Sequence, residues 1–397
     1  MKKITFETLK NYPNKINNTK KRIGILIDGK TNYYSTSSYI RLLSPLNEIS
    51  NDFSIRIIDN DSDSQFYNDL LNNNKILDVL ILQRDIIDKA NLDSDLIKSL
   101  FKILKKNNIK IIFDIDDDLL NIDKTHVDYD KYSNLKDILE FIITQSDLIT
   151  VSTEYLKNQL IELNKNIIII PNTLLKLWDL NQKQINKLNS RETITIGYFG
   201  TRTHGQDLQI IKTAITNIKE RFPKKNILIE TVGISYENQN WIKKHEIPNN
   251  YKDNPTIKDK LKNFIQYFLN KFNLLPSSLP YCDFIKWIKN ETKWDIGIAP
   301  LEDNNINRSK SNLKYLEYTA LNIPGIYSNI GPYRDIKLKK TGLIVNNNVK
   351  EWEDAFINLI ENEELYETLV NNAYEDVKKN YMVENASLTW KQILIKI

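Results

Sequence analysis

The length, composition and charge of the chain set the first limits on what it can be. Its 397 residues are too many for one ordinary domain and suit two, and its 41% hydrophobic content is enough for two cores. A net charge of +4 on 27% charged residues is too even for the basic face of a nucleic-acid-binding protein, so no nucleic-acid partner is expected. The single cysteine, Cys282, excludes an internal disulfide and a cysteine metal cage, and with three histidines a histidine metal site is not expected.

Neither a secretory signal nor a membrane span is visible in the sequence. Met1 is followed by two lysines and a mixed polar stretch rather than an apolar segment. No run approaches the roughly 18 apolar residues that a membrane span requires. We therefore expect a cytoplasmic protein. The lysines near its start (Lys15, Lys20 and Lys21) are either solvated or in contact with anionic lipid at the inner face of the membrane.

Short apolar runs alternate with helical patterns in the first half of the chain. The runs are rich in Ile, Val and Leu and lack polar alternation, which is typical of parallel strands buried on both faces. They cover residues 22–27, 54–58, 78–82, 110–115, 147–151 and 166–170, and helical patterns cover 92–106 and 134–145. This βαβ series predicts an open parallel sheet with helices on both faces.

A polar stretch over residues 172–192 interrupts the series, which then restarts. Strands are expected at 193–199, 226–232, 294–299, 323–328 and 342–345, and helices at 206–221, 281–289, 312–321 and 349–361. Residues 236–275 are more polar and are interpreted as an insertion with some helix. Amphipathic helices at 364–379 and 384–395 end the chain. We expect one α/β domain over residues 1–175 and a second over 190–380, with about 381–397 packing back on the first.

Glycine is scarce: the chain has ten, whereas glycine usually makes up about 7% of the residues of a protein. Eight of the ten lie in the stretch from Gly197 to Gly342. We therefore expect each of these glycines to serve a tight turn or a close backbone approach.

Ligands of doubly wound sheets bind beyond the carboxyl ends of the strands. In the first domain this rule selects residues 28–30 with 35–41, and the acidic run 114–118. In the second it selects residues 200–204 and 300–311, which lead into the helix that holds Glu317. These two sets can face one cleft.

Several motifs in fixed order resemble one enzyme family. The run IGYFGT at 196–201, followed by His204 and Asp207, and the run WDIGIAPL at 294–301 look like parts of the donor domain of family-four-type GT-B glycosyltransferases (glycosyl transferases group 1). The segment KSNLKYLEY at 310–318, continuing into ALNIP at 320–324, resembles the K-x-x-E-Y-x-A-L-G-x-P signature of that superfamily. Residues 114–119 resemble the strand-end D-x-D-D of a bacterial surface-glycan subgroup. The resemblance spans residues 22–390.

The resemblance implies a fold and an activity. The fold would be GT-B, with two Rossmann-like domains facing a central cleft and the last helix crossing back to the first domain. The activity would be the transfer of a hexose-type sugar from a nucleotide-diphosphate sugar, such as a UDP- or GDP-sugar, with retention of configuration. The acceptor would be a glycan, a glycoprotein or a lipid-linked molecule in surface polysaccharide or glycan biosynthesis. Enzymes of this kind usually work without a bound metal, so no further cofactor is expected.

The chemistry of the donor selects the site residues. A nucleotide-sugar diphosphate carries about two negative charges and its leaving group gains more, so cations and helix N-terminal amides should surround it. By resemblance, Glu317 would accept hydrogen bonds from the ribose hydroxyls, since one carboxylate offers acceptors to both. The expected donor-binding residues are Gly200, Thr201, Arg202, His204, Asn307, Lys310, Ser311 and Glu317, and the expected catalytic residues are Asp116, Asp117 and Lys310.

Each of these residues also has an ordinary interpretation. Glu317 alone would be a solvated helix residue, and Arg202 and Lys310 alone would be surface cations. The run Asp116 to Asp118 could be a solvated turn with a helix N-cap, or ligands of a divalent metal. His126 and His245 are interpreted as ordinary surface or core residues.

The sequence departs from the family pattern at three places. Many members carry a first glutamate eight positions before the second, and here that position is Ser309. The usual acidic contact to the donor sugar is therefore either absent or supplied by another residue, such as Asp303 or Asn307. The usual Arg…Lys-Gly phosphate pair is also altered, with Arg202 in the arginine role and His204-Gly205-Gln206 near the lysine region. Asn322 replaces a glycine, which is tolerable because asparagine also accepts left-handed dihedrals.

Other functions on the same scaffold remain open at this point. One is a non-catalytic glycan- or nucleotide-binding protein, which turnover of a nucleotide sugar would exclude. Another is a phosphorylase, which would need a covalently bound pyridoxal cofactor. An epimerase of the same architecture would turn over the donor without any acceptor.

Overall fold

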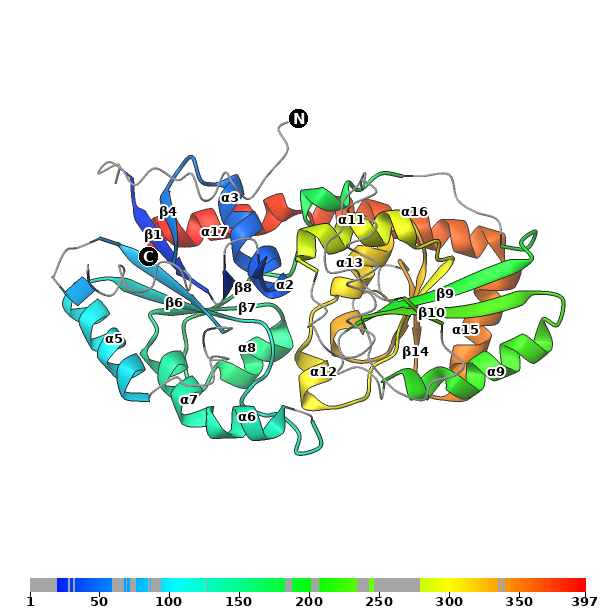
Figure 1. Cartoon of the computed structure of the whole chain (residues 1–397), viewed down its shortest axis with the longest axis horizontal. Coiled ribbons are helices and arrows are strands. Elements are labelled where there is room, and N and C mark those ends of the chain that lie inside the picture. Colours follow the sequence, from blue (N-terminus) through cyan, green and yellow to red (C-terminus); the bar gives the residue numbers. More distant parts are fainter. Residues whose placement is uncertain are drawn as a thin grey trace, which may run out of the picture. The chain divides into compact units, whose positions relative to one another are not determined.

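A computed structural model of the chain describes residues 20–397 apart from residues 28, 31–32, 59–67, 69, 72–75, 85, 87–93, 127, 183–187, 201–206, 234–242, 246–278, 335 and 337–339 (Figure 1). The chain divides into two compact units. The first unit comprises Met1–Thr173, Ser309–Ser311 and Val383–Ile397, and the second comprises Leu174–Arg308 and Asn312–Met382.

A six-stranded parallel sheet forms the centre of the first unit, in the order β4-β1-β5-β6-β7-β8. All six predicted strands are present with ends within one residue of the prediction, because apolar runs of this length leave little freedom in register. The strands are β1 (Arg22–Leu26), β4 (Ser54–Ile58), β5 (Val79–Gln83), β6 (Lys110–Ile115), β7 (Leu148–Val151) and β8 (Ile167–Ile169); β2 (Gly29–Lys30) and β3 (Tyr33–Tyr34) form a separate antiparallel pair.

Helices cover both faces of this sheet. One face packs against α5, α7 and α8 in a core that includes Ile111, Phe113 and Ile115 of β6. Side chains alternate along a strand, so Ile112 and Asp114 of β6 point to the opposite face. The helices of the unit are α2 (Thr36–Ser38), α3 (Ser44–Glu48), α5 (Ser94–Lys106), α6 (Tyr129–Asn134), α7 (Lys136–Gln145), α8 (Glu154–Leu160) and α17 (Val383–Lys396).

A helical segment over residues 36–48 includes most of the strand-end stretch 35–41 that the sequence selected, and the sequence did not predict a helix there. A π-helical turn, η1 (Tyr39–Leu43), joins α2 to α3. Ser35 caps its start by accepting a hydrogen bond from the Ser38 amide at 3.1 Å. Pro45 has no N–H and cannot donate to the Arg41 carbonyl one turn earlier. The indole Nε1 of Trp390 in α17 donates to that carbonyl at 3.0 Å instead.

The last helix therefore packs on the first unit, as the sequence predicts, and α17 lies beside α3 in Figure 1. Its inward face carries Trp390, Ile393 and Leu394, all buried. Leu388 on the same helix points outward and is 60% exposed.

The second unit holds another six-stranded parallel sheet, in the order β11-β10-β9-β12-β13-β14. This is the 3-2-1-4-5-6 order of the Rossmann fold, whose ligand crevice opens where the order reverses, here between β9 and β12. The strands are β9 (Thr193–Phe199), β10 (Asn226–Val232), β11 (Lys243–His245), β12 (Ile296–Ala299), β13 (Gly325–Ser328) and β14 (Leu343–Val345). The sequence did not predict β11, which lies in the expected insertion; most of that insertion is outside the described residues.

One face of this sheet packs against α9, α15 and the start of α16, and α11 and α13 are not part of that core. The helices are η3 (Lys176–Trp178), η5 (Asp207–Ile211), α9 (Lys212–Arg221), α11 (Tyr281–Glu291), α12 (Asn305–Ser309), α13 (Leu313–Ala320), η6 (Gly331–Tyr333), α15 (Val349–Glu361) and α16 (Glu363–Asn380). Asn322, just after α13, has a φ of 62°, so it adopts the left-handed conformation that the sequence analysis considered tolerable for asparagine at this position.

Two glycines of the central strands let aromatic rings lie directly on the sheet. A Cβ added at Gly197 would be 1.8 Å from the Trp294 ring, and one at Gly297 would be 2.5 Å from the Tyr318 ring. The close approach expected of these glycines is therefore a contact with an aromatic side chain. Among the described residues, none of the helices combines the length and the apolar content that crossing a bilayer takes.

The packing of α17 generates a stability prediction. We expect Trp390→Ala to lower the free energy of unfolding by about 3–5 kcal/mol. The change removes a fully buried indole and also the N–H that donates to the Arg41 carbonyl, to which Pro45 cannot donate. Urea denaturation followed by circular dichroism measures the change. Leu388→Ala, on the same helix but exposed, should change stability by less than about 0.5 kcal/mol. Equal losses in the two variants would show that α17 does not depend on its inward face.

Candidate functional site

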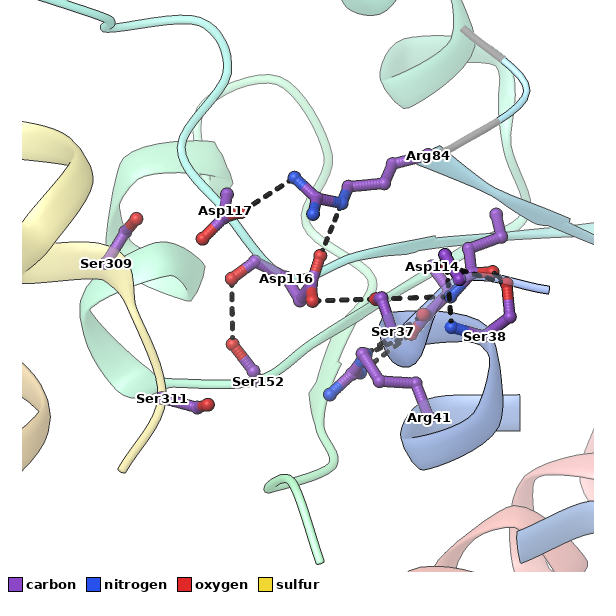
Figure 2. Close-up of polar contacts among 12 residues, drawn as sticks. Ser37, Ser38, Arg41, Arg84, Asp114, Asp116, Asp117, Ser152, Ser309 and Ser311 are labelled. Atoms are coloured by element: carbon purple, nitrogen blue, oxygen red, sulfur yellow. Dashed lines mark hydrogen bonds and ion pairs between the residues drawn. The ribbon is translucent and has the colours of Figure 1, made fainter. Parts of the chain in front are cut away.

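The acidic run at the end of β6 is held by basic and hydroxyl side chains of the first unit (Figure 2). Arg84, which follows β5, forms two ion pairs, each with an N···O distance of 2.7 Å. Its Nη1 donates a hydrogen bond to Asp117 Oδ2. Its Nε lies beside Asp116 Oδ1, but the angles there are not those of a hydrogen bond. Ser37 donates to Asp116 Oδ2 at 2.7 Å, and Ser152 donates to the Asp116 carbonyl at 3.1 Å. The two carboxylates are therefore fixed in place and their charge is partly balanced by one guanidinium.

Beneath this run, a buried ion pair joins the sheet to the helical segment 36–48. The Arg41 guanidinium lies against Asp114, with Nη2 to Oδ1 at 2.7 Å and Nε within 3.0 Å of both carboxylate oxygens. Its Nη1 donates to the Ile170 carbonyl at 2.8 Å and to Asn172 Oδ1 at 2.9 Å. Thr150 donates to Asp114 Oδ1 at 2.7 Å. Both charges are almost fully removed from water and fully engaged, which is the condition for a buried ion pair to be tolerated.

The short segment Ser309–Ser311 is anchored to the first unit by three hydrogen bonds. The Asp118 amide donates to Ser309 Oγ at 3.0 Å, Thr153 Oγ1 donates to the Ser309 carbonyl at 3.0 Å, and Asn172 Nδ2 donates to Ser311 Oγ at 2.8 Å. Sequence reasoning placed this segment in the second domain, and the bonds explain why it groups with the first unit. Lys310, which was expected both to bind the donor and to act in catalysis, is therefore part of the same unit as Asp116 and Asp117.

His126 also belongs to this neighbourhood, although the sequence interpretation assigned it no role. Its Nδ1 accepts a hydrogen bond from the Asp128 amide at 3.2 Å. Burial lowers its pKa, with Asp128 opposing the shift and Lys310 reinforcing it, and Asp117 also acts on it. The hydrogen bond and the lowered pKa both favour the neutral imidazole, in which Nδ1 accepts from the Asp128 amide and Nε2 carries the proton. The signal in the sequence was its position, eight residues after the acidic run.

Asp118 plays a different part from its neighbours. Its side chain is fully buried, and the Asn121 amide and side chain donate to its carboxylate at 3.0–3.2 Å. Burial raises its pKa, and the hydrogen bonds from Asn121 oppose that shift. Asp118 therefore closes the turn after β6 from a buried position, and not as the solvated residue or helix N-cap considered for this run, while Asp116 and Asp117 face Arg84.

In the second unit, Glu317 on α13 is buried, with 1% of its surface exposed. Tyr281 on α11 donates to Glu317 Oε1 at 2.6 Å, and the described residues offer Oε2 no hydrogen-bond partner. Burial raises the pKa of Glu317 to about 7, while the Tyr281 hydrogen bond and Lys314 oppose the shift. A solvated helix residue would show none of these features, and a buried acceptor without a partner indicates a place where a ligand or water binds.

The sequence did not indicate Tyr281, which donates to Glu317, or Trp178, which donates to Tyr281. The Trp178 indole donates to the Tyr281 hydroxyl at 3.4 Å, and Lys289 Nζ donates to the Trp178 carbonyl at 2.7 Å. Tyr281 was noted only as the first residue of a predicted helix, and Trp178 falls in the polar connecting stretch. Nothing in the spacing of the three residues along the chain links them.

Some of the other residues expected to contact the donor lie in the described part of the second unit, and some lie outside the described residues. Asn307 is buried, and its amide donates to the Glu302 carbonyl at 3.0 Å and to Asp207 at 3.4 Å. Asp303, the other candidate to replace the missing glutamate, is exposed and accepts from Arg308 at 2.6 Å. Gly200 directly follows β9, at the point where the strand order reverses. Thr201, Arg202 and His204 lie outside the described residues.

The acidic run Asp116 to Asp118, which could also hold a divalent metal, is already engaged by neighbouring side chains. Asp116 and Asp117 already share one guanidinium, and Asp118 is engaged by Asn121. Within the described part of the chain, no three His, Cys, Asp or Glu side chains converge so that they could hold a metal ion. A cation would have to displace Arg84 to bind at this run.

Comparison with known proteins bears on the fold. No protein-family model and no curated protein sequence matches the chain. Among solved structures, HepE of Anabaena in complex with UDP and glucose is similar over 95% of this chain and 100% of its own, with a TM-score of 0.58 and 10% identity. A glycosyltransferase from Rickettsia africae matches 95% of this chain and 99% of its own (TM-score 0.54, 15% identity). The trehalose-6-phosphate protein of E. coli bound with UDP-2-fluoro glucose covers the same shares (TM-score 0.55, 11% identity).

These structures confirm the GT-B fold that the sequence resemblance implied. At identities of 10–15% the likeness shows the fold alone.

The buried ion pair of the first unit generates a second stability prediction. Asp114→Asn should lower the free energy of unfolding by about 3–5 kcal/mol, because it leaves the Arg41 guanidinium buried without a counter-charge. Glu162→Gln, which breaks an exposed pair with Lys165 in the same unit, should cost less than about 1 kcal/mol. Urea unfolding of both variants measures the difference. A loss of less than about 1 kcal/mol for Asp114→Asn would mean that Arg41 gains water in solution.

Proposed function

We propose that the chain is a glycosyltransferase that moves a hexose-type sugar from a nucleotide-diphosphate sugar to a glycan, glycoprotein or lipid-linked acceptor. The observation that carries the proposal is Glu317, a buried carboxylate with one oxygen held by Tyr281 and the other without a partner among the described residues. A vicinal diol such as that of a ribose would satisfy this oxygen and add a second bond. The solved structures with this fold include ones that hold UDP or a UDP-sugar.

The first unit supplies groups suited to the reacting end of such a donor. Asp116 and Asp117 are fixed carboxylates, and Lys310 is a cation anchored beside them through Ser309 and Ser311. In this proposal Lys310 stabilises negative charge as it develops on the leaving group, which is where a cation contributes most to the rate. The sequence resemblance supports retention of configuration and a role in surface-glycan synthesis. The lysines near the start of the chain support a peripheral contact of the protein with the inner face of the membrane.

A non-catalytic nucleotide-binding protein on the same scaffold is the second candidate. It is favoured by Ser309 at the position of the family's first glutamate, and by Asn307 and Asp303 being engaged by neighbours. Nucleotide binding alone does not separate the two candidates. Release of UDP or GDP from a nucleotide sugar in the presence of a suitable acceptor would support the enzyme, and binding without turnover would support the alternative.

Glu317→Ala should weaken nucleotide binding about ten- to a hundredfold, because it removes a charge-assisted hydrogen bond worth about 1.5–3 kcal/mol. Calorimetric titration with UDP, GDP, ADP and CMP identifies the base in the wild type and then measures the loss in the variant. Glu367→Ala, which removes an exposed carboxylate on α16 of the same unit, should bind like the wild type. Unchanged affinity in a folded Glu317→Ala protein would remove Glu317 from the site.

Turnover should be nearly unchanged by a chelator, because Arg84 already balances part of the charge of Asp116 and Asp117, and Lys310 offers a cation to the donor's phosphates without a metal. The measurement is the initial rate of sugar transfer with and without EDTA. If EDTA abolished the rate and magnesium or manganese restored it, Asp116 to Asp118 would be metal ligands and Arg84 would not be the group that balances their charge during turnover.

A further inference from the structure

The hydroxyl of Tyr281 is the central atom of a buried chain of three side chains in the second unit. It receives a hydrogen bond from Trp178 Nε1 at 3.4 Å and donates to Glu317 Oε1 at 2.6 Å. Trp178 lies in η3, Tyr281 begins α11 and Glu317 lies in α13, so three separate segments meet at this hydroxyl. All three side chains are buried.

We propose that Tyr281 is a positioning residue that keeps the Glu317 carboxylate charged and leaves its Oε2 as the acceptor for the donor's hydroxyls. The inference rests on the proposed function, in which Glu317 binds the ribose of a nucleotide.

The geometry assigns each hydrogen bond a direction. An indole N–H can only donate, so the bond from Trp178 occupies a lone pair of the Tyr281 oxygen and leaves the phenol proton for Glu317. That proton takes Oε1, and Oε2 is left without a partner among the described residues. A carboxylate held at one oxygen is limited in its rotation, so its second oxygen has a fixed direction before a ligand arrives.

The charged and titratable groups that act on Glu317 are Lys314 from its own helix, Tyr281 from α11, Tyr318 and Tyr333. Burial raises the pKa of each tyrosine well above its usual value, so all three keep their protons at neutral pH. Burial also raises the pKa of Glu317 to about 7, against the lowering by Tyr281 and Lys314. Of these groups, Glu317 alone changes charge near neutral pH.

The sign of the pH dependence follows from the direction of the bonds. Ligand hydroxyls donate to the carboxylate, so the charged form of Glu317 binds them and the protonated form binds them less well. Nucleotide affinity is then greatest above the pKa of Glu317 and falls as the pH drops through about 7. The Tyr281 bond lowers that pKa, so its removal moves the loss of affinity to a higher pH.

The test compares UDP binding by the wild type and Tyr281→Phe in calorimetric titrations between about pH 5.5 and 9, a range that brackets the pKa of Glu317. A hydrogen bond to a charged group corresponds to about one to two pKa units, so the midpoint of the affinity curve should rise by about one to two pH units in the variant. Affinity at neutral pH should be about tenfold weaker, and the two curves should approach each other at high pH.

Tyr315→Phe is the matched control. Tyr315 lies on the same helix as Glu317, is buried, and donates its hydroxyl to a different carboxylate, Asp376, at 2.7 Å. The control loses the same kind of hydrogen bond in the same unit. Its midpoint should equal that of the wild type, and an equal shift in both variants would mean that general loosening of the unit causes the effect.

A second readout does not depend on any nucleotide. Infrared titration follows the protonated-carboxyl band of Glu317, assigned by its absence in Glu317→Gln, in the wild type and in Tyr281→Phe. The band should titrate at a higher pH in Tyr281→Phe, and equal titration would overturn the positioning role. If the wild type bound none of the nucleotides while this shift was present, the proposed function would fail and the role of Tyr281 toward Glu317 would stand.

Discussion

The guanidinium of Arg41 is buried with 2% of the residue exposed, and a buried cation has to find its counter-charge and acceptors within the protein. It finds them in Asp114 at the centre of the sheet, in the Ile170 carbonyl after β8 and in Asn172. These partners lie 73 or more positions away along the chain. The pairing therefore requires that β6, the end of β8 and the segment 36–48 be in place together.

Two further parts of the first unit depend on this arrangement. The backbone carbonyl of Arg41, freed by Pro45, receives the indole of Trp390 and so ties in the last helix. Asn172, which accepts from Arg41, uses its amide to hold Ser311, and Ser311 follows Lys310. The buried side chain of Arg41 thus helps to fix Asn172, and through Asn172 the segment that contains Lys310.

Much of the fold could be predicted from the sequence, and the reason is physical. Strands buried on both faces must be continuous and apolar, so the six strands of the first unit stand out as Ile-, Leu- and Val-rich runs. The segment 36–48 was missed because its helix contains Pro45 and a π-helical turn, which break the periodicity on which a helix prediction rests. Of the candidate site, the sequence indicated Glu317, Asp116 and Asp117 because they lie in motifs or directly after a strand. Arg84, His126 and Tyr281 act only through tertiary contacts between segments that are far apart in the sequence.

Position 309, where the family that the sequence resembles often has a glutamate, holds a serine, and the contacts of this position favour serine. Ser309 is fully buried, and its oxygen accepts a hydrogen bond from the Asp118 amide, next to a carboxyl whose pKa burial already raises. A glutamate at 309 would bring a second carboxylate into this buried acidic neighbourhood, and one of the two would have to take up a proton or leave the interior. Serine supplies the same acceptor without a charge. The neighbouring carboxylates that keep their charge beside this position are Asp116 and Asp117, and Arg84 forms an ion pair with each of them.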